Sequence, residues 1–216
     1  MPASDELFST SGRPRGHVIS AVDGRNDLAR YRLAGLAGLL TGVLLLFNDL
    51  RREGLVPENA FTECIAPLPA VLALYAVTGL YLRQREPAGR LGLVGYALNL
   101  AGIAGLLIAE FASHYIFADL PMAEVDALLE GRARAGFLVI AAVFAVGVTL
   151  FSVASWRSRI YPRWAVGLYA AGFLLAAGRG AVPDLVVSLG FLLGSIGVLG
   201  LSWTLRRIST PEPVPA

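Results

Sequence analysis

Glu110 and His114 are the two residues of this sequence best placed to do chemistry together. They are four positions apart, and on a helix this spacing puts both side chains on one face. A carboxylate beside an imidazole could pass a proton near neutral pH, or it could supply two ligands to a divalent metal. Glu110 also ends a long apolar run, so the alternative is that the helix has already left the hydrocarbon there and both residues lie in interfacial water.

Other polar residues are expected at the same level as this pair, because each lies at the end of an apolar run. If the helices pack closely, they could converge with Glu110 and His114 into an outward-facing polar pocket. The alternative is a ring of helix-end residues that marks only the membrane interface, with Arg179 and Asp184 as a local ion pair of little energetic weight. The residues concerned are Asn48, Asp49, Glu63, Arg179 and Asp184.

Asn99 is the one strongly polar side chain well inside an apolar stretch. We expect it to hydrogen-bond to a neighbouring helix, a contact worth on the order of 1 kcal/mol in a membrane. A contact with a substrate is the alternative.

The composition indicates which elements must position these residues. The chain has 216 residues, an apolar fraction of 56%, a charged fraction of 16% and a mean hydropathy of +0.63. Soluble domains have about 45–50% apolar and about 25% charged residues. The shortage of charge is explained if most of the surface faces lipid, so the lipid bilayer is the first expected partner. The arginines are scattered between apolar runs, which argues against a nucleic-acid partner.

Six uncharged stretches follow one another along the chain. A helix needs roughly 20 apolar residues to cross a bilayer. We therefore predict an all-α, polytopic transmembrane helix bundle over residues 30–207. Its spans, about six, are expected near residues 32–50, 64–82, 91–113, 135–156, 163–179 and 184–205.

The first and fifth of these stretches are short, and a re-entrant or surface segment is the alternative for the fifth. Residues 1–29 are polar and irregular and are predicted to form a flexible cytoplasmic arm. Residues 208–216 are rich in proline and are predicted to be a disordered tail.

The arginines predict the orientation. With six crossings, 13 of the 18 arginines fall on the side of the two termini and five on the other side. The positive-inside rule places the arginine-rich side, and with it both termini, in the cytoplasm of a multi-pass protein of the cell membrane. The five arginines predicted outside are Arg51, Arg52, Arg132, Arg134 and Arg179.

Two local patterns add detail. Residues 121–133 place Met122, Val125, Leu128 and Leu129 on one face, which predicts a short amphipathic helix on the outer surface, either a plain connector or a lid over the pocket. The GxxxG spacings Gly38–Gly42 and Gly190–Gly194 predict close helix packing.

The Arg-rich turns LYLRQRE (Leu80–Glu86) and RIYPRW (Arg159–Trp164), with the segment RLAGLAGLL beginning at Arg32, resemble a broad set of uncharacterised bacterial multi-span membrane proteins. The resemblance covers roughly residues 30–207. It implies a polytopic membrane architecture and no activity.

No Walker loop, HExxH, GxSxG or CxxC motif occurs, and Cys64 is the only cysteine. We therefore expect no cofactor, no resident metal and no enzymatic activity. The expected function is that of a structural, accessory or regulatory membrane component, alone, as a homo-oligomer or with a membrane-protein partner. The alternative is a small transporter or an ion- or proton-conducting protein that uses the outer Glu110/His114 cluster. An intramembrane enzyme ranks third.

Overall fold

The computed structural model describes residues 16–207, with side chains from residue 28 onward. This part of the chain is all-helical and contains no strand, which confirms the all-α part of the predicted fold class. The elements are α1 (Gly16–Arg52), α2 (Ala60–Ile65), α3 (Leu68–Phe111), a π-helical turn (Ala112–Ile116), a 3-10 turn (Phe117–Asp119), α4 (Met122–Glu130), α5 (Arg132–Ser158), α6 (Arg163–Ala177) and α7 (Asp184–Arg206).

Four helical segments of the described chain are long and apolar enough to cross a membrane: Leu28–Arg52, Ala60–Asp119, Arg132–Ser158 and Asp184–Arg206. The number is smaller than the six predicted spans for two reasons. The second and third predicted spans both lie in the 60-residue segment Ala60–Asp119. The fifth corresponds to α6, which has only 15 residues.

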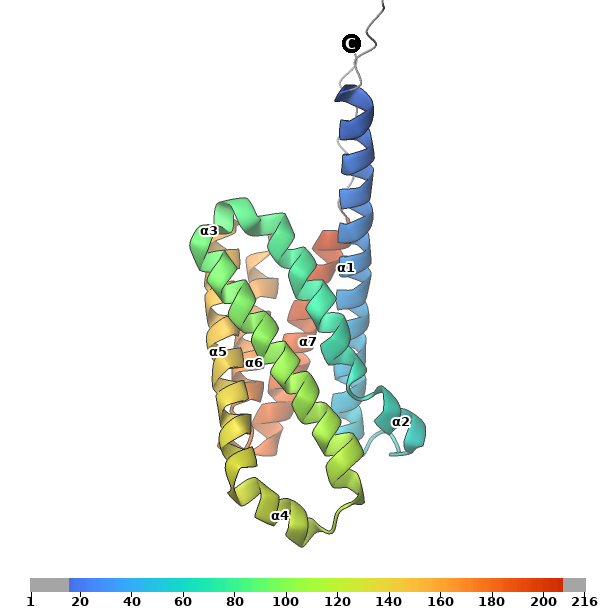
Figure 1. Cartoon of the computed structure of the whole chain (residues 1–216), viewed down its shortest axis with the longest axis vertical. Coiled ribbons are helices and arrows are strands. Elements are labelled where there is room, and N and C mark those ends of the chain that lie inside the picture. The colour runs from blue at the N-terminus through green and yellow to red at the C-terminus, as the bar shows by residue number, and fades with distance from the viewer. Residues whose placement is uncertain (1–15, 208–216) are drawn as a thin grey trace, which may run out of the picture.

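Helix α3 is a hairpin of two legs. Pro87 lies inside it, and Gly89 has φ 55° and ψ −148°, a backbone conformation that glycine adopts without steric cost. Figure 1 shows the chain doubling back at this point. Near the kink the legs are joined by the stacked rings of Tyr81 and Tyr96, whose centroids are 4.4 Å apart. The Arg-rich turn between the second and third predicted spans is therefore a sharp kink within one helical element.

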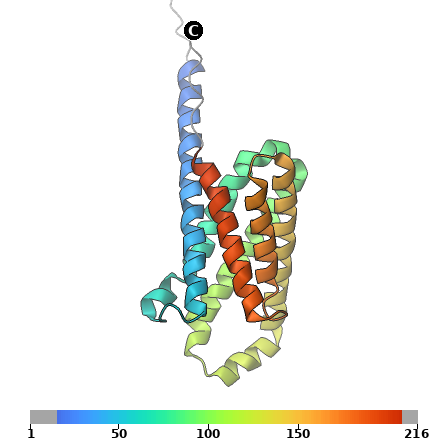
Figure 2. The same ribbon diagram turned by 180° about the vertical axis from the view of Figure 1, so that it is seen from behind.

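The helices form a closed ring. Helix α1 packs against α7 and α3, α3 packs against α5, α5 against α6, and α6 against α7. In Figures 1 and 2 the start of α1, the kink of α3, the α5–α6 turn and the end of α7 lie at one end of the bundle. The arginine-rich connections of the sequence therefore share that end, and we call the other one the arginine-poor end.

Two boundaries differ from the predicted ones. Helix α1 already begins at Gly16, so the part of the predicted arm that the structure describes, residues 16–29, is helical. No proline interrupts the sequence between Gly16 and Arg52, and the helix can extend backwards from its apolar part. Residues 1–15 and the predicted tail at 208–216 lie outside the described residues.

Close contacts at glycine hold the ring together. A Cβ on Gly38 would overlap the side chain of Ser202, and one on Gly42 would overlap Leu199, both on α7. A Cβ on Gly190 would lie 2.8 Å from the backbone nitrogen of Ala176 on α6. The close packing predicted from the GxxxG spacings is therefore present at both places, α1–α7 and α6–α7.

The tightest contact between α3 and α5 is at Gly147, where an added Cβ would overlap the backbone of Leu98 and Asn99. Because backbone cannot move aside as a side chain can, we expect Gly147→Ala to destabilise the protein by roughly 1–3 kcal/mol. The measurement is thermal unfolding in detergent. Gly136→Ala on the same helix is the matched control, because a Cβ there has nothing within 4 Å. Equal unfolding temperatures for the two variants would contradict this packing.

Candidate functional site

A cavity of about 470 Å³ lies inside the ring, in the half of the bundle near the arginine-poor end. Every long helix of the ring contributes to its lining. On α1 the lining extends from Thr41 to Arg52, and eleven residues of helix rise about 16 Å, roughly half of a 30 Å hydrocarbon core. The volume is within the range of small-molecule sites, about 300–1,000 Å³.

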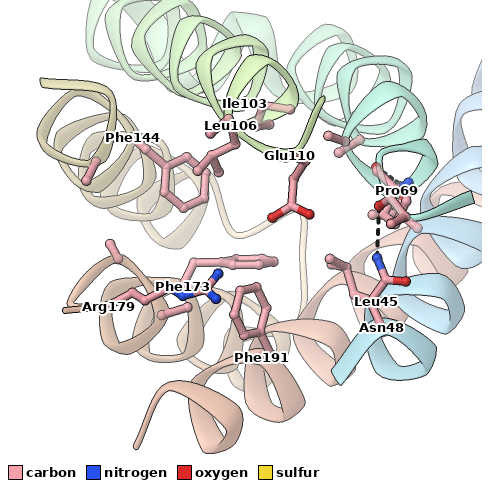
Figure 3. Close-up of a pocket in the computed structure, with 18 of the residues that line it drawn as sticks. Leu45, Asn48, Pro69, Ile103, Leu106, Glu110, Phe144, Phe173, Arg179 and Phe191 are labelled. Atoms are coloured by element: carbon pink, nitrogen blue, oxygen red, sulfur yellow. Dashed lines mark hydrogen bonds between the residues drawn. The ribbon is translucent and has the colours of Figure 1, made fainter. Parts of the chain in front are cut away.

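The walls of the cavity are apolar and aromatic. Figure 3 shows Phe144, Phe173 and Phe191 around the space, with Leu106 above them. Phe173 packs edge-to-face against Phe144, with ring centroids 5.8 Å apart, and against Tyr169 at 5.1 Å. The deep part of the site therefore suits an apolar group.

Charged side chains line the cavity at the arginine-poor end, which we call the mouth: Asp49, Arg52, Glu110 and Arg179. Asp49, Glu110 and Arg179 are three of the residues predicted to converge, and the structure brings them together. Arg52 was not singled out from the sequence. Its guanidinium lies 3.7 Å from Asp49 and 4.7 Å from the ring centroid of Phe191. This cation–π contact with Phe191 on α7 joins Arg52 to a residue far along the sequence.

His114 lies behind Glu110 and does not line the cavity. It sits in the π-helical turn Ala112–Ile116, a distortion often found at functional sites. Its Nε2 is 3.4 Å from Oε2 of Glu110, as the i, i+4 spacing predicts. The same Nε2 is 3.2 Å from Nη2 of Arg51, a buried arginine.

These two contacts of His114 cannot both be hydrogen bonds at once. A guanidinium only donates, so Arg51 bonds to Nε2 only when that nitrogen carries no proton. Donation from Nε2 to Glu110 needs the proton. Whether Nε2 of His114 carries a proton, through tautomer or through protonation of the ring, therefore decides whether its partner is Glu110 or Arg51.

The remaining predicted members of the cluster lie elsewhere. Asp184 is the exposed first residue of α7, and Glu63 is on α2; neither lines the cavity. Asn48 does line it, and its Nδ2 donates to the carbonyl of Ala66 at 2.9 Å. This bond ties the end of α2 to α1 beside the mouth.

The amphipathic helix predicted within residues 121–133 forms as α4, Met122–Glu130. In Figure 1 it joins the second leg of α3 to α5 at the arginine-poor end. Leu129 lines the cavity, whereas Met122 and Leu128 are exposed. Helix α4 is thus a connector that also supplies part of the cavity wall.

Asn99 is completely buried, and its Nδ2 donates to the hydroxyl of Tyr169 at 2.6 Å. The bond joins the second leg of α3 to α6 across the ring, as expected for an intramembrane polar residue. The Oδ1 atom of Asn99 has no hydrogen-bond partner among the described residues. Tyr169 lines the cavity, so this bond positions one of its walls.

The opposite half of the bundle is closed. Phe151, Leu201 and Leu205 are each at most 2% exposed. Beyond them, Nε2 of the buried Gln84 donates to Oγ of Ser155 at 2.9 Å.

Tyr161, between α5 and α6, completes this closure by donating to the carbonyl of Leu80 at 2.8 Å. Burial raises the pKa of the Tyr161 hydroxyl, which keeps it protonated as a donor. The cavity therefore ends inside the bundle in this conformation.

The Glu110–His114 pair does not extend to a metal site in the described chain. Within residues 16–207, no group of three or more His, Cys, Asp or Glu side chains could hold a metal ion. The pair therefore has two ligands of the kind a divalent metal accepts and lacks a third.

Comparisons with protein-family models, with curated proteins and with solved structures found no match to this chain.

The Asn99–Tyr169 bond predicts an effect on stability. We expect Tyr169→Phe to lower the free energy of unfolding by roughly 1–2 kcal/mol, because it leaves a buried amide without its partner. The double variant with Asn99→Leu should recover part of the loss, since both polar groups are then gone. Chemical or thermal unfolding in detergent measures both. Wild-type stability of Tyr169→Phe would show that the bond contributes nothing.

Proposed function

We propose that this protein is a multi-pass integral membrane protein with six crossings and with both termini in the cytoplasm. Four long apolar helical segments support membrane insertion. The proposed count of six follows if each leg of α3 crosses separately and the 15-residue α6 crosses with help from flanking residues. The positive-inside rule supports the orientation, and the resemblance to bacterial multi-span proteins agrees with a cell membrane.

We further propose that the protein acts without catalysis, as an accessory or regulatory component of the membrane. The observation that carries this proposal is the cavity itself, an apolar space with a charged mouth that ends inside the bundle. A dead-end site of this kind is suited to binding a molecule rather than to conducting one. A ligand bound in the cavity would then change how the protein interacts with a second copy of itself or with a membrane-protein partner.

Transport of a proton or a cation is the second candidate. The juxtaposition of Glu110, His114 and Arg51 favours it, because the hydrogen bonds of His114 change with its protonation. Glu110 lines the cavity and could exchange a proton with it. The closed half of the bundle around Phe151 and Leu205 argues against transport, because a translocation path would have to open there.

Topology is tested by labelling single cysteines in a Cys64→Ser background with a membrane-impermeant maleimide. We expect Asp126→Cys in α4 to react in intact cells, because the arginine-poor end is proposed to face outward. Glu86→Cys beside the kink and Pro213→Cys in the C-terminal segment should react only after the membrane is permeabilised. Reaction of Pro213→Cys in intact cells would refute an even number of crossings.

Flux in proteoliposomes separates the two functional candidates. For an accessory protein we expect proton and cation flux no higher than in empty liposomes, with wild type and Glu110→Gln alike. A flux that wild type carries and Glu110→Gln loses would favour transport and overturn the accessory role. The neutral amide preserves the size of Glu110 and removes only its charge and its proton.

A further inference from the structure

Among the residues that the structure describes, Arg179 is the one cation at the mouth with no carboxylate in contact. It lies in the α6–α7 connection and lines the cavity. Figure 3 shows its guanidinium turned inward beside Phe173, on the opposite side of the cavity from Glu110. Among the described residues, its side chain makes no hydrogen bond or ion pair. A guanidinium has five N–H donors, so Arg179 has its full capacity free for an anion.

Arg52 adds a second guanidinium facing the same space. It is 3.7 Å from Asp49, which is an ion-pair distance but too long for a hydrogen bond. It lies over the ring of Phe191 and lines the cavity, and among the described residues its side chain makes no hydrogen bond. Two guanidiniums that share one opening repel each other, and a bound anion between them would relieve that repulsion.

Basic groups lie beside both carboxylates at the mouth. Asp49 pairs with Arg52, and Glu110 is 3.4 Å from His114, which is a counter-charge only when its ring is protonated. Arg51 adds further positive charge 3.2 Å from His114. A cationic ligand would therefore meet the repulsion of Arg52 and Arg179, whereas an anionic ligand would find Arg179 open.

We propose that the cavity binds an amphipathic anion, a molecule with one carboxylate or phosphate and a slender apolar body. The anionic group lies between Arg52 and Arg179. The apolar body extends inward among Phe144, Phe173 and Phe191, in a space whose lining follows α1 for about 16 Å. A free fatty acid and a single-chain phospholipid both have this chemistry. Such binding rests on the proposed role of the cavity as a binding site and not on the number of membrane crossings.

Binding is measured with radiolabelled dodecanoate and the full-length protein in nanodiscs of phosphatidylcholine, with empty nanodiscs subtracted. We expect saturable binding, and competition by dodecanoate and by single-chain phosphatidate. The stronger competitor of these two identifies the source of the ligand. Dodecanol and dodecylamine should compete at least tenfold more weakly. Absence of saturable binding, or competition by dodecylamine equal to that of dodecanoate, would overturn the proposal.

Three charge variants make the test specific to the mouth. Arg179→Gln should weaken binding about tenfold or more, because it removes a charge-assisted hydrogen bond. Glu110→Gln should strengthen binding, because it removes the negative charge opposite Arg179. Arg132→Gln is the matched control, an exposed arginine at the same end of the bundle that does not line the cavity, and it should bind as wild type does. Wild-type affinity in Arg179→Gln, or weaker binding in Glu110→Gln, would refute the assigned position of the anion.

A fourth variant tests the apolar part. Leu106→Trp should fill the space and abolish binding while the charges at the mouth stay in place. Its unfolding temperature is measured alongside. If the variant does not fold, Phe144→Ala provides the same test by removing a wall that contacts none of the mouth charges, with several-fold weaker binding expected. Binding unaffected by the change in the wall would place the ligand outside the cavity and overturn the proposal.

Discussion

Direct contact between helix backbones at glycine is the constraint on which the rest of the structure depends. In lipid there is no hydrophobic force that drives one apolar helix onto another, so close van der Waals packing must do it. Gly147 lets α5 lie against the backbone of Asn99, and Gly190 lets α7 lie against α6. These contacts fix the diameter of the ring. The Asn99–Tyr169 bond lies next to the close contact at Gly147, and the aromatic walls of the cavity occur where side chains leave the inside of the ring unfilled.

The mouth shows how charge is accommodated at such a ring. Asp49 and Arg52 are three residues apart on α1, and Glu110 on α3 is four residues before His114 in the π-helical turn, so each carboxylate has a basic residue about one turn further along the chain. Arg179 comes from a connection and has no such neighbour. Helix geometry alone accounts for the two local pairs. The unpaired positive charge of Arg179 arises only where α1, α3 and the α6–α7 connection meet.

The all-α class, the element order and the convergence of Asp49, Glu110 and Arg179 could be predicted because they follow from apolar run length and from helix ends. Three features could not. One is the joining of two helical legs by a kink at Pro87 and Gly89, because sequence does not tell such a tight reversal from a longer turn. Another is the pair of contacts Arg52–Phe191 and His114–Arg51, because each joins residues that are far apart in the sequence. The π-helical turn at His114 has no sequence signature that we recognise.

The packing of α1 against α7 has a consequence for synthesis. These are the first and last helices of the ring, so the ring stays open until α7 has been synthesised. Before then the faces of α1 and α6 that will meet α7 lack their partner helix. The binding space is therefore a late product of folding, and a nascent chain that stops before Asp184 contains most of the cavity lining without enclosing it.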